Sequence, residues 1–104
     1  MILYILNAQG TNLYKIGVTR YKVSKRIAAL QTGNPNKIVV VWQLESEYAN
    51  NIEKTVHRFY SYCKTSGEWF EFEDISLEEV KEKIKQIEQH IILIKENEKS
   101  SNRY

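Results

Sequence analysis

The first eighteen residues constrain the fold of this 104-residue chain more than any other stretch. Two apolar runs of strand length, residues 1–6 and 13–18, flank a cluster of turn formers, Asn-Ala-Gln-Gly-Thr-Asn. This pattern predicts a β-hairpin. Its strands carry polar side chains, with Tyr4 in the first strand and Tyr14 and Lys15 in the second. The register of the hairpin decides whether these side chains face the core or a site.

Side-chain alternation along the two strands sets the expected register. A turn centred on Gln9 and Gly10 gives the pairs Tyr4 with Lys15, Leu6 with Leu13, and Ile2 with Gly17. The opposite face then collects an apolar set suited to a core: Leu3, Ile5, Tyr14, Ile16 and Val18. A slip of one residue would pair Tyr4 with Tyr14 and turn the charge of Lys15 toward the core, which costs free energy. We therefore expect the first register.

Two helices and a third strand are predicted after the hairpin. Apolar residues at helical spacing predict a helix over residues 22–32, which Gly33 ends. The β-branched run in residues 37–45 predicts a third strand at the centre of the sheet. Residues 46–63 are expected to form a second helix with Ser46 as its N-cap. The buried stripe of that helix is expected to be Ala49, Ile52, Val56, Phe59 and Cys63.

The last third of the chain predicts an extended segment and a long helix. The aromatic residues 68–72 are typical of a short strand or an extended segment against the core, and residues 76–79 match a capping box that opens the helix. Its apolar seam comprises Leu77, Val80, Ile84, Ile87, Ile91 and Ile94. Some twenty helical residues measure ~30 Å, so the seam either packs on the domain or overhangs it and pairs with a second copy. Residues 97–104 form a polar tail that we expect to fray.

Length and composition indicate one globular domain with a C-terminal helix. Hydrophobic residues make up 42% of the chain and charged residues 27%, as in ordinary globular proteins. No apolar run approaches the ~20 residues that cross a bilayer, and the N-terminus lacks the basic region of a signal peptide. Cys63 has no partner for an intramolecular disulfide. We expect a cytoplasmic protein without membrane contact, with residues 1–75 as its functional domain and residues 76–104 as the helix and polar tail.

Charge is distributed unevenly along the chain. Residues 1–44 contain no acid and carry a net charge of +6, residues 45–75 carry −4, and residues 76–104 balance. The basic residues of the first segment are Lys15, Arg20, Lys22, Lys25, Arg26 and Lys37. A basic half of this kind is typical of a polyanionic partner such as nucleic acid, and a solvated face is the alternative.

Four side chains on three predicted elements suit the hydrolysis of a phosphodiester bond. A carboxylate such as Glu53 is a ligand that Mg²⁺ prefers, and Arg26 offers a planar fork to phosphate oxygens. Tyr4 can act as a base if its pKa, about 10 when unperturbed, is lowered, and the ammonium of Lys15 would lower it. His57 follows Glu53 by one helical turn on the same flank.

Each of these residues also has a purely structural interpretation. The alternatives are strand packing for Tyr4, surface charge for Lys15 and Arg26, an ion pair for Glu53, a half-buried histidine bonded to a backbone carbonyl for His57, and a loop cap for Glu68. None of these six residues indicates a catalytic site by itself. Their order and spacing along the chain are more informative.

That order and spacing resemble the GIY-YIG nucleases over about residues 1–72. Residues 2–4, Ile-Leu-Tyr, are similar to the Gly-Ile-Tyr element, and residues 15–17, Lys-Ile-Gly, to the Tyr-Ile-Gly element eleven residues later. A compact branch common in phages and large viruses carries the motifs found here at residues 14–17, 26–27, 30–33, 52–57 and 67–70. With lysine at position 15, the role of the second tyrosine passes either to Lys15 or, in the slipped register, to Tyr14.

The resemblance implies an α+β fold in which a three-stranded antiparallel sheet is flanked by helices in the order β-β-α-β-α. It implies a metal-dependent endonuclease that cuts DNA with a single Mg²⁺ or Mn²⁺ held by Glu53. Tyr4 and Lys15 would activate the water, Arg26 would neutralise the phosphate, and His57 would orient water or phosphate. The residues that would contact the DNA backbone are Arg20, Lys22, Lys25 and Lys37. The rival hypothesis is a catalytically silent module that binds nucleic acid or protein. The last helix either packs on the domain or mediates a homodimer.

Overall fold

The structure, a computed structural model, describes residues 1–101. Its elements are β1 (Ile2–Ala8), β2 (Leu13–Thr19), α1 (Val23–Gln31), β3 (Ile38–Glu45), α2 (Ala49–Phe59), a 3₁₀ turn (Ser61–Cys63), β4 (Trp69–Glu71) and α3 (Leu77–Ser101). The α+β class is confirmed. The sheet has four strands instead of the three expected, because the extended segment at residues 69–71 hydrogen-bonds along β2.

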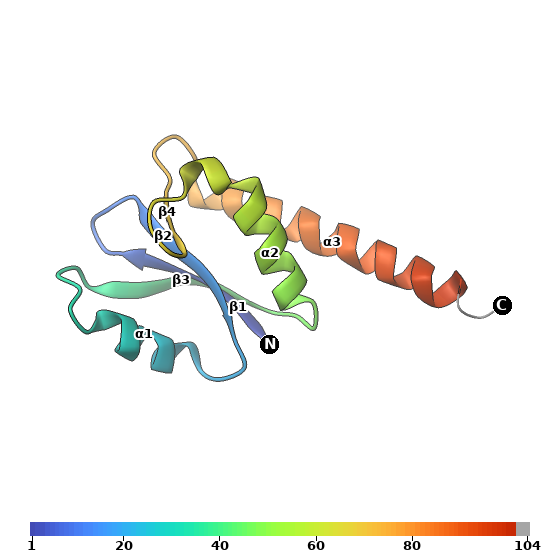
Figure 1. The fold of residues 1–104 in the computed structure, drawn as a ribbon, viewed down its shortest axis with the longest axis horizontal. Helices are drawn as coiled ribbons and strands as arrows, with labels where there is room; N and C mark the ends of the chain where they lie inside the picture. The colour runs from blue at the N-terminus through green and yellow to red at the C-terminus, as the bar shows by residue number, and fades with distance from the viewer. Residues whose placement is uncertain (102–104) are drawn as a thin grey trace.

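The strands lie in the order β3-β1-β2-β4, and each neighbouring pair is antiparallel (Figure 1). Because β2 and β3 both run antiparallel to β1, they are parallel to each other, and α1 makes the crossover between them. The expectation that β3 is central was wrong: β1 is an inner strand and β3 lies at the edge. A β-branched run reports packing on the faces of a strand and does not distinguish an edge from the centre.

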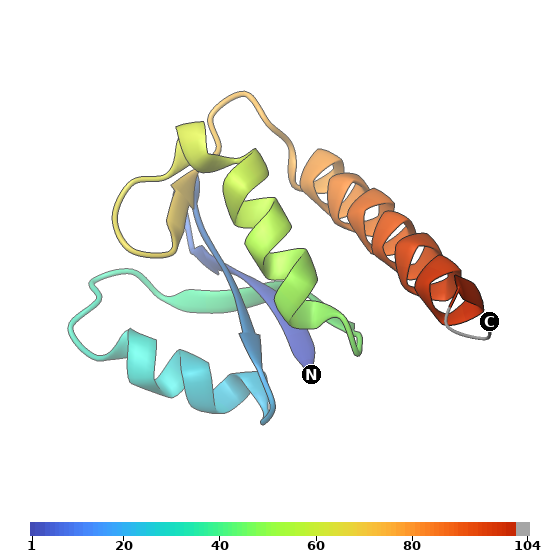
Figure 2. The same cartoon turned by 45° about the vertical axis from the view of Figure 1, so that its right-hand side comes forward.

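Helices cover both faces of the sheet (Figures 1 and 2). The larger core lies between the sheet and the pair α2 and α3, and its fully buried members are Leu3, Ile5, Ile16, Ala49, Ile52, Val56, Phe70, Val80 and Ile84. The smaller core lies under α1 and contains Tyr4, Leu6, Val23 and Ile38. The faces expected from the hairpin alternation are therefore correct: Leu3 and Ile5 point to one core, and Tyr4 points to the other.

The hairpin register differs from the expected one by two residues. Tyr4 lies opposite Gly17, and Lys15 lies opposite Leu6. The loop is longer than a two-residue turn because Thr11 Oγ1 donates to the Ala8 carbonyl at 2.6 Å, and a positive φ of 83° at Gly10 lets the backbone reverse there. A shift of two residues keeps every side chain on its face, so the one-residue slip that would pair Tyr4 with Tyr14 is wrong as well.

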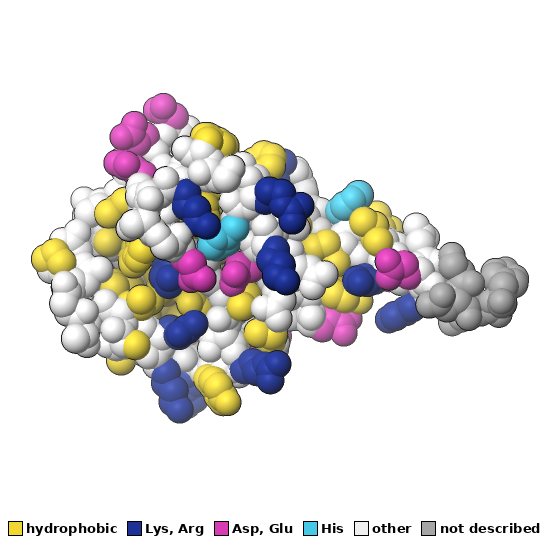
Figure 3. All heavy atoms as spheres, in the orientation of Figure 1, with side chains coloured by type: hydrophobic (Ala, Val, Ile, Leu, Met, Phe, Trp, Pro, Cys, Tyr) yellow, Lys and Arg dark blue, Asp and Glu magenta, His cyan; other side chains and the backbone are white. Residues whose placement is uncertain are grey.

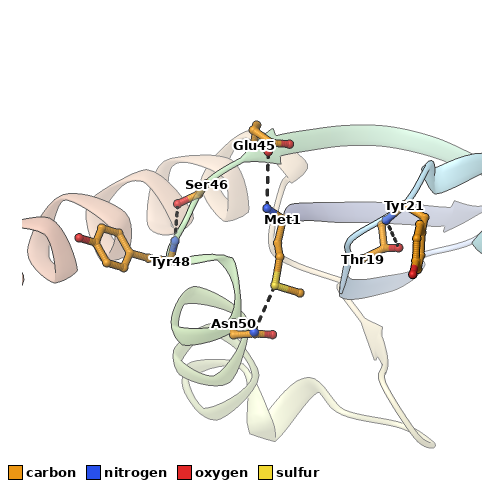
Figure 4. A network of polar contacts seen from close by, with 7 residues as sticks. All are labelled: Met1, Thr19, Tyr21, Glu45, Ser46, Tyr48 and Asn50. Carbon is orange, nitrogen blue, oxygen red and sulfur yellow. Dashed lines mark hydrogen bonds and ion pairs between the residues drawn. The ribbon is translucent and has the colours of Figure 1, made fainter.

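The start and the buried face of α2 differ from the sequence expectation. The N-cap is Tyr48 and not Ser46, whose hydroxyl instead accepts from the Tyr48 amide at 3.1 Å (Figure 4). Phe59 is 48% exposed, and Tyr60 takes its place in the core because α2 ends at this point and the chain tightens into the 3₁₀ turn.

The capping of α3 by Ser76 is confirmed, since its hydroxyl accepts from the Glu79 amide at 3.1 Å. Val80 and Ile84 are fully buried in the larger core, and Ile87 and Ile91 pack against it. The helix then extends past the domain (Figure 1), and it continues to Ser101 where fraying was expected from residue 97.

Two apolar side chains on the extension of α3 are left unburied, with Leu93 58% and Ile94 43% exposed. Residues 102–104 of the expected tail lie outside the described residues. No helix in the described part of the chain is long and apolar enough to cross a membrane.

Candidate active site

Tyr4 and Gly17 form the floor of the candidate site. They lie opposite each other on β1 and β2, and the Tyr4 ring is fully buried. A Cβ atom added to Gly17 would lie 2.5 Å from the tyrosine hydroxyl and 2.7 Å from Cζ. The ring therefore occupies the space that any other residue at position 17 would need, and the glycine is required by this close approach.

The Tyr4 hydroxyl has no hydrogen-bond partner among the residues that the structure describes. Burial raises the pKa of Tyr4 above its usual value, and the nearby Arg26 guanidinium opposes this rise only in part. The expectation that Lys15 lowers the pKa of Tyr4 was wrong, because the Lys15 ammonium is engaged elsewhere. Tyr4 is therefore a neutral phenol in the free protein.

Lys15 forms an ion pair with Glu68, with 2.8 Å between Nζ and Oε2. The Lys15 side chain is 12% exposed and that of Glu68 46% exposed. The hydrogen bond from Lys15 lowers the pKa of Glu68 despite partial burial, so this carboxylate is ionised at neutral pH. The pair forms because Trp69 of β4 lies opposite Lys15, which brings the preceding residue, Glu68, next to the lysine.

Glu68 is the residue that the sequence reasoning did not place in the site. Its interpretation as a loop cap was wrong, since its carboxylate binds a side chain 53 residues away in sequence. The available signal was its position in the motif Gly-Glu-Trp-Phe, directly before an aromatic strand. That signal gave no partner, because the pairing of β4 with β2 is a long-range contact.

Glu53 lies on α2 and is half-buried. Burial raises the pKa of its carboxyl, His57 and Lys15 oppose the rise, and the carboxylate of Glu68 adds to it. The two carboxylates therefore lie close enough to repel each other. Within the described part of the chain Glu53 forms no ion pair with Arg26 or His57, the two partners that its purely structural interpretation would require.

His57, one turn after Glu53, is held by the backbone of the sheet. Its Nε2 donates to the Ile16 carbonyl at 2.7 Å, and its ring meets Phe70 edge-on with centroids 4.9 Å apart. Because β4 pairs only with Leu13–Lys15, this carbonyl lies on the part of β2 that β4 does not cover. The interpretation of His57 as a half-buried histidine bonded to a backbone carbonyl is confirmed, and Nδ1 is the ring nitrogen left for another partner.

Arg26 and three of the expected DNA-contacting residues lie near one another. Arg26 is exposed on α1, and Arg20, Lys22 and Lys25 surround the turn before that helix. Lys37 lies elsewhere: its carbonyl accepts from the Gln9 amide at the hairpin loop, at the opposite end of β1. Figure 3 shows acidic side chains and a histidine surrounded by Lys and Arg side chains on one face of the molecule.

Within residues 1–101, no group of three or more His, Cys, Asp or Glu side chains is arranged to hold a metal ion. The oxygen ligands of the cleft are the carboxylates of Glu53 and Glu68. Such a donor set does not fit a closed structural site. It does fit a Mg²⁺ that keeps most of its waters and takes other ligands from a bound phosphate.

The fold is an α+β domain with its sheet between helices, and Tyr4, Arg26 and Glu53 lie near one another in it. The chain belongs to the T5orf172 domain family, whose model matches residues 1–88. This phage-associated family is grouped with GIY-YIG-like nuclease-related domains. The comparisons with curated proteins and with solved structures found no match. Family membership therefore supports a nuclease-like class and assigns no role to an individual residue.

Proposed function

We propose that this chain is a metal-dependent endonuclease that hydrolyses DNA phosphodiester bonds. The observation that carries the proposal is the cluster in which a buried hydroxyl, a partly desolvated carboxylate, a half-exposed ion pair and the Arg26 guanidinium come together. Such groups cost folding free energy and are typical of sites that bind and react. The basic surface beside the cleft matches a polyanionic substrate.

In this proposal Glu53 holds a single Mg²⁺ or Mn²⁺, which supplies charge neutralisation at the scissile phosphate. The raised pKa of Glu53, which burial causes and the neighbouring Glu68 carboxylate increases, supports this role, because a bound cation would offset both effects. Arg26 binds the phosphate oxygens through its planar fork. The phosphate thereby lies between α1 and α2.

Tyr4, Lys15 and Glu68 orient the attacking water. The Tyr4 hydroxyl donates a hydrogen bond at the floor of the cleft, which its position over Gly17 fixes. Glu68, ionised and anchored by Lys15, accepts the proton of the water. Glu68 and not Tyr4 is therefore the proposed base, because the raised pKa of Tyr4 keeps its hydroxyl protonated at neutral pH. His57 orients α2 against β2 through its bond to Ile16.

The test is cleavage of supercoiled plasmid with Mg²⁺ or Mn²⁺, with EDTA as control. Glu53→Gln and Glu68→Gln should abolish nicking, and Glu82→Gln, an exposed change on α3, should not. Circular dichroism establishes that each variant folds. Activity that survives Glu53→Gln would refute the assigned metal ligand. A parallel RNA substrate tests the choice of DNA.

The second candidate is a catalytically silent nucleic-acid-binding module. The absence of a group of three metal-ligating side chains in the described residues favours it. It predicts salt-sensitive DNA binding that neither metal nor Glu53→Gln alters. DNA binding of this kind, together with no cleavage of duplex, single-stranded or branched DNA with Mg²⁺ or Mn²⁺, would establish this module and exclude the nuclease.

A further inference from the structure

Tyr21 is a large aromatic side chain that the fold presents to solvent. It is 71% exposed on the turn between β2 and α1. Its backbone amide donates to Thr19 Oγ1 at 3.1 Å, and Thr19 is itself only 8% exposed (Figure 4). The backbone that carries the ring is therefore fixed, while the ring covers no core. Neither strand packing nor helix packing explains this tyrosine.

The surroundings of Tyr21 are basic. Lys25 Nζ lies 5.7 Å from the centre of the ring. Two grooves meet at Tyr21: one of about 520 Å³ contains Arg20, Lys22 and Lys25, and one of about 390 Å³ reaches Arg26. No acidic side chain lines either groove. A ligand in these grooves therefore meets positive charge, an aromatic face and, at one end, the arginine of the proposed active site.

We infer that Tyr21 stacks an unpaired base of the substrate, so that the enzyme acts on DNA with unpaired nucleotides beside the scissile phosphate. This inference rests on the proposed function for the identity of the substrate. The cationic groove suits the phosphate backbone, and an exposed aromatic ring offers a face to any base. In a fully paired duplex the base faces are already stacked, so the ring would have nothing to bind. Forks, flaps and frayed ends supply the free base.

Tyr21 lies in the same groove as Arg26, the arginine of the proposed active site. Both residues line the groove of about 390 Å³, together with Thr19 and Lys25. A strand whose phosphate lies at Arg26 can continue along this groove to the ring. The stacked base is thus within a few nucleotides of the cut, and Tyr21 selects substrates by the state of those nucleotides rather than by their sequence.

The test measures DNA binding by fluorescence anisotropy in EDTA, so that nothing is cleaved. The substrates are a fully paired duplex, the same duplex with a single-stranded flap, and an oligothymidine strand. The variants are Tyr21→Ala and Tyr21→Phe, which keeps a stacking ring. Tyr62→Ala is the matched control, because Tyr62 is 73% exposed but lies beside Glu71 and Glu73 in an acidic groove.

Tyr21→Ala should weaken binding of the flap and of the oligothymidine between about 5-fold and 100-fold. It should change binding of the paired duplex less than twofold, and Tyr21→Phe and Tyr62→Ala should bind all three like the wild type. A 2-aminopurine at the unpaired position should be quenched by the wild type and by Tyr21→Phe but not by Tyr21→Ala. Equal losses on paired and unpaired DNA, or no loss, would overturn the inference.

These outcomes are independent of those of the cleavage assay. If the plasmid is not cut but the flap preference depends on Tyr21, stacking stands and the nuclease proposal fails. If the plasmid is cut and Tyr21→Ala binds flap DNA normally, the nuclease proposal stands and stacking fails. The alternative interpretation is that the basic grooves bind an acidic protein. In that case DNA binding would not depend on unpaired bases.

Discussion

Replacing Tyr4 by phenylalanine should stabilise the protein while it removes activity. The hydroxyl is fully buried and has no hydrogen-bond partner in residues 1–101. A buried polar group without a partner costs about 1–3 kcal/mol of desolvation, which the variant no longer incurs. The phenylalanine ring keeps the contacts with Leu6 and the rest of the smaller core. For a domain of this size, 1 kcal/mol corresponds to roughly 4–8 °C in Tm.

The free energy of unfolding can be measured by urea titration, followed by circular dichroism at neutral pH. Tyr4→Phe should exceed the wild type by about 1 kcal/mol or more. Tyr62→Phe, which removes a hydroxyl from a side chain that is 73% exposed, should lie within about 0.5 kcal/mol of the wild type. Plasmid cleavage by Tyr4→Phe should fall below detection because the water loses its donor at the floor of the cleft.

A loss of stability in Tyr4→Phe would refute this reasoning. It would mean that the hydroxyl is hydrogen-bonded in the folded protein, with Arg26 as the nearest candidate. The double variant Tyr4→Phe with Arg26→Met then decides: coupling between the two changes would identify the bond, and additivity would exclude it.

Four further results are expected. Gly17→Ala should destabilise the fold by about 1–3 kcal/mol in urea titration, because the new Cβ would lie 2.5 Å from a buried hydroxyl, and unchanged stability would contradict the close approach. The raised pKa of Glu53 means that the wild type loses stability as pH rises from about 4.3, its unfolded value, through the raised pKa. Glu53→Gln should lack this loss when Tm is measured over a pH series. Parallel curves of Tm against pH for the wild type and Glu53→Gln would contradict the prediction. The lowered pKa of Glu68 gives the opposite sign: its stabilisation is present above about pH 4.3 and is lost as pH falls through the lowered pKa. Glu68→Gln should remove that acid-side loss and also reduce the loss at higher pH, because the Glu68 carboxylate adds to the raised pKa of Glu53. If α3 mediates a homodimer, changing Leu93 and Ile94 to lysine should convert a dimer to a monomer in light scattering, and a monomeric wild type would exclude the dimer.

The local elements and the faces of the hairpin were predictable because their signals are local. Periodicity placed the buried stripe of α2 at Ala49, Ile52 and Val56, and alternation placed Tyr4 and Leu3 on opposite faces. Both signals need only a few neighbouring residues. The register was not predictable to the residue, because side-chain bonds in the loop set it and alternation is unchanged by a shift of two.

Long-range placement was the part that the sequence did not reveal. The edge position of β3 and the pairing of β4 with β2 depend on how the whole chain packs. The Lys15–Glu68 ion pair follows from that pairing, which is why its acidic member was missed and why Lys15 was assigned to Tyr4. Tyr4, Lys15 and Glu53, which come from the motifs at residues 2–4, 15–17 and 52–57, are nevertheless brought near one another by the fold.

The first part of the α3 seam packs on the domain, and its last part overhangs the domain. Ile84 is fully buried in the larger core, so its substitution by a charge would unfold the domain rather than test dimerisation. The exposed apolar residues begin only at Leu93, beyond the contact with the domain. Any second copy therefore meets the extension, away from the cleft between α1 and α2. A monomer would nick one strand, and a dimer of this kind would bring two distant sites to the DNA.

The two faces of the sheet bury different kinds of side chain. The larger core under α2 and α3 is almost wholly apolar, whereas the face under α1 carries an unpaired phenol and a nearly buried ammonium. Tyr4 and Ile5 are adjacent on one inner strand and point to these opposite sides. A strand fixed by the larger core can hold an unsatisfied hydroxyl in place on its other face, because its own pairing with two neighbours prevents relaxation.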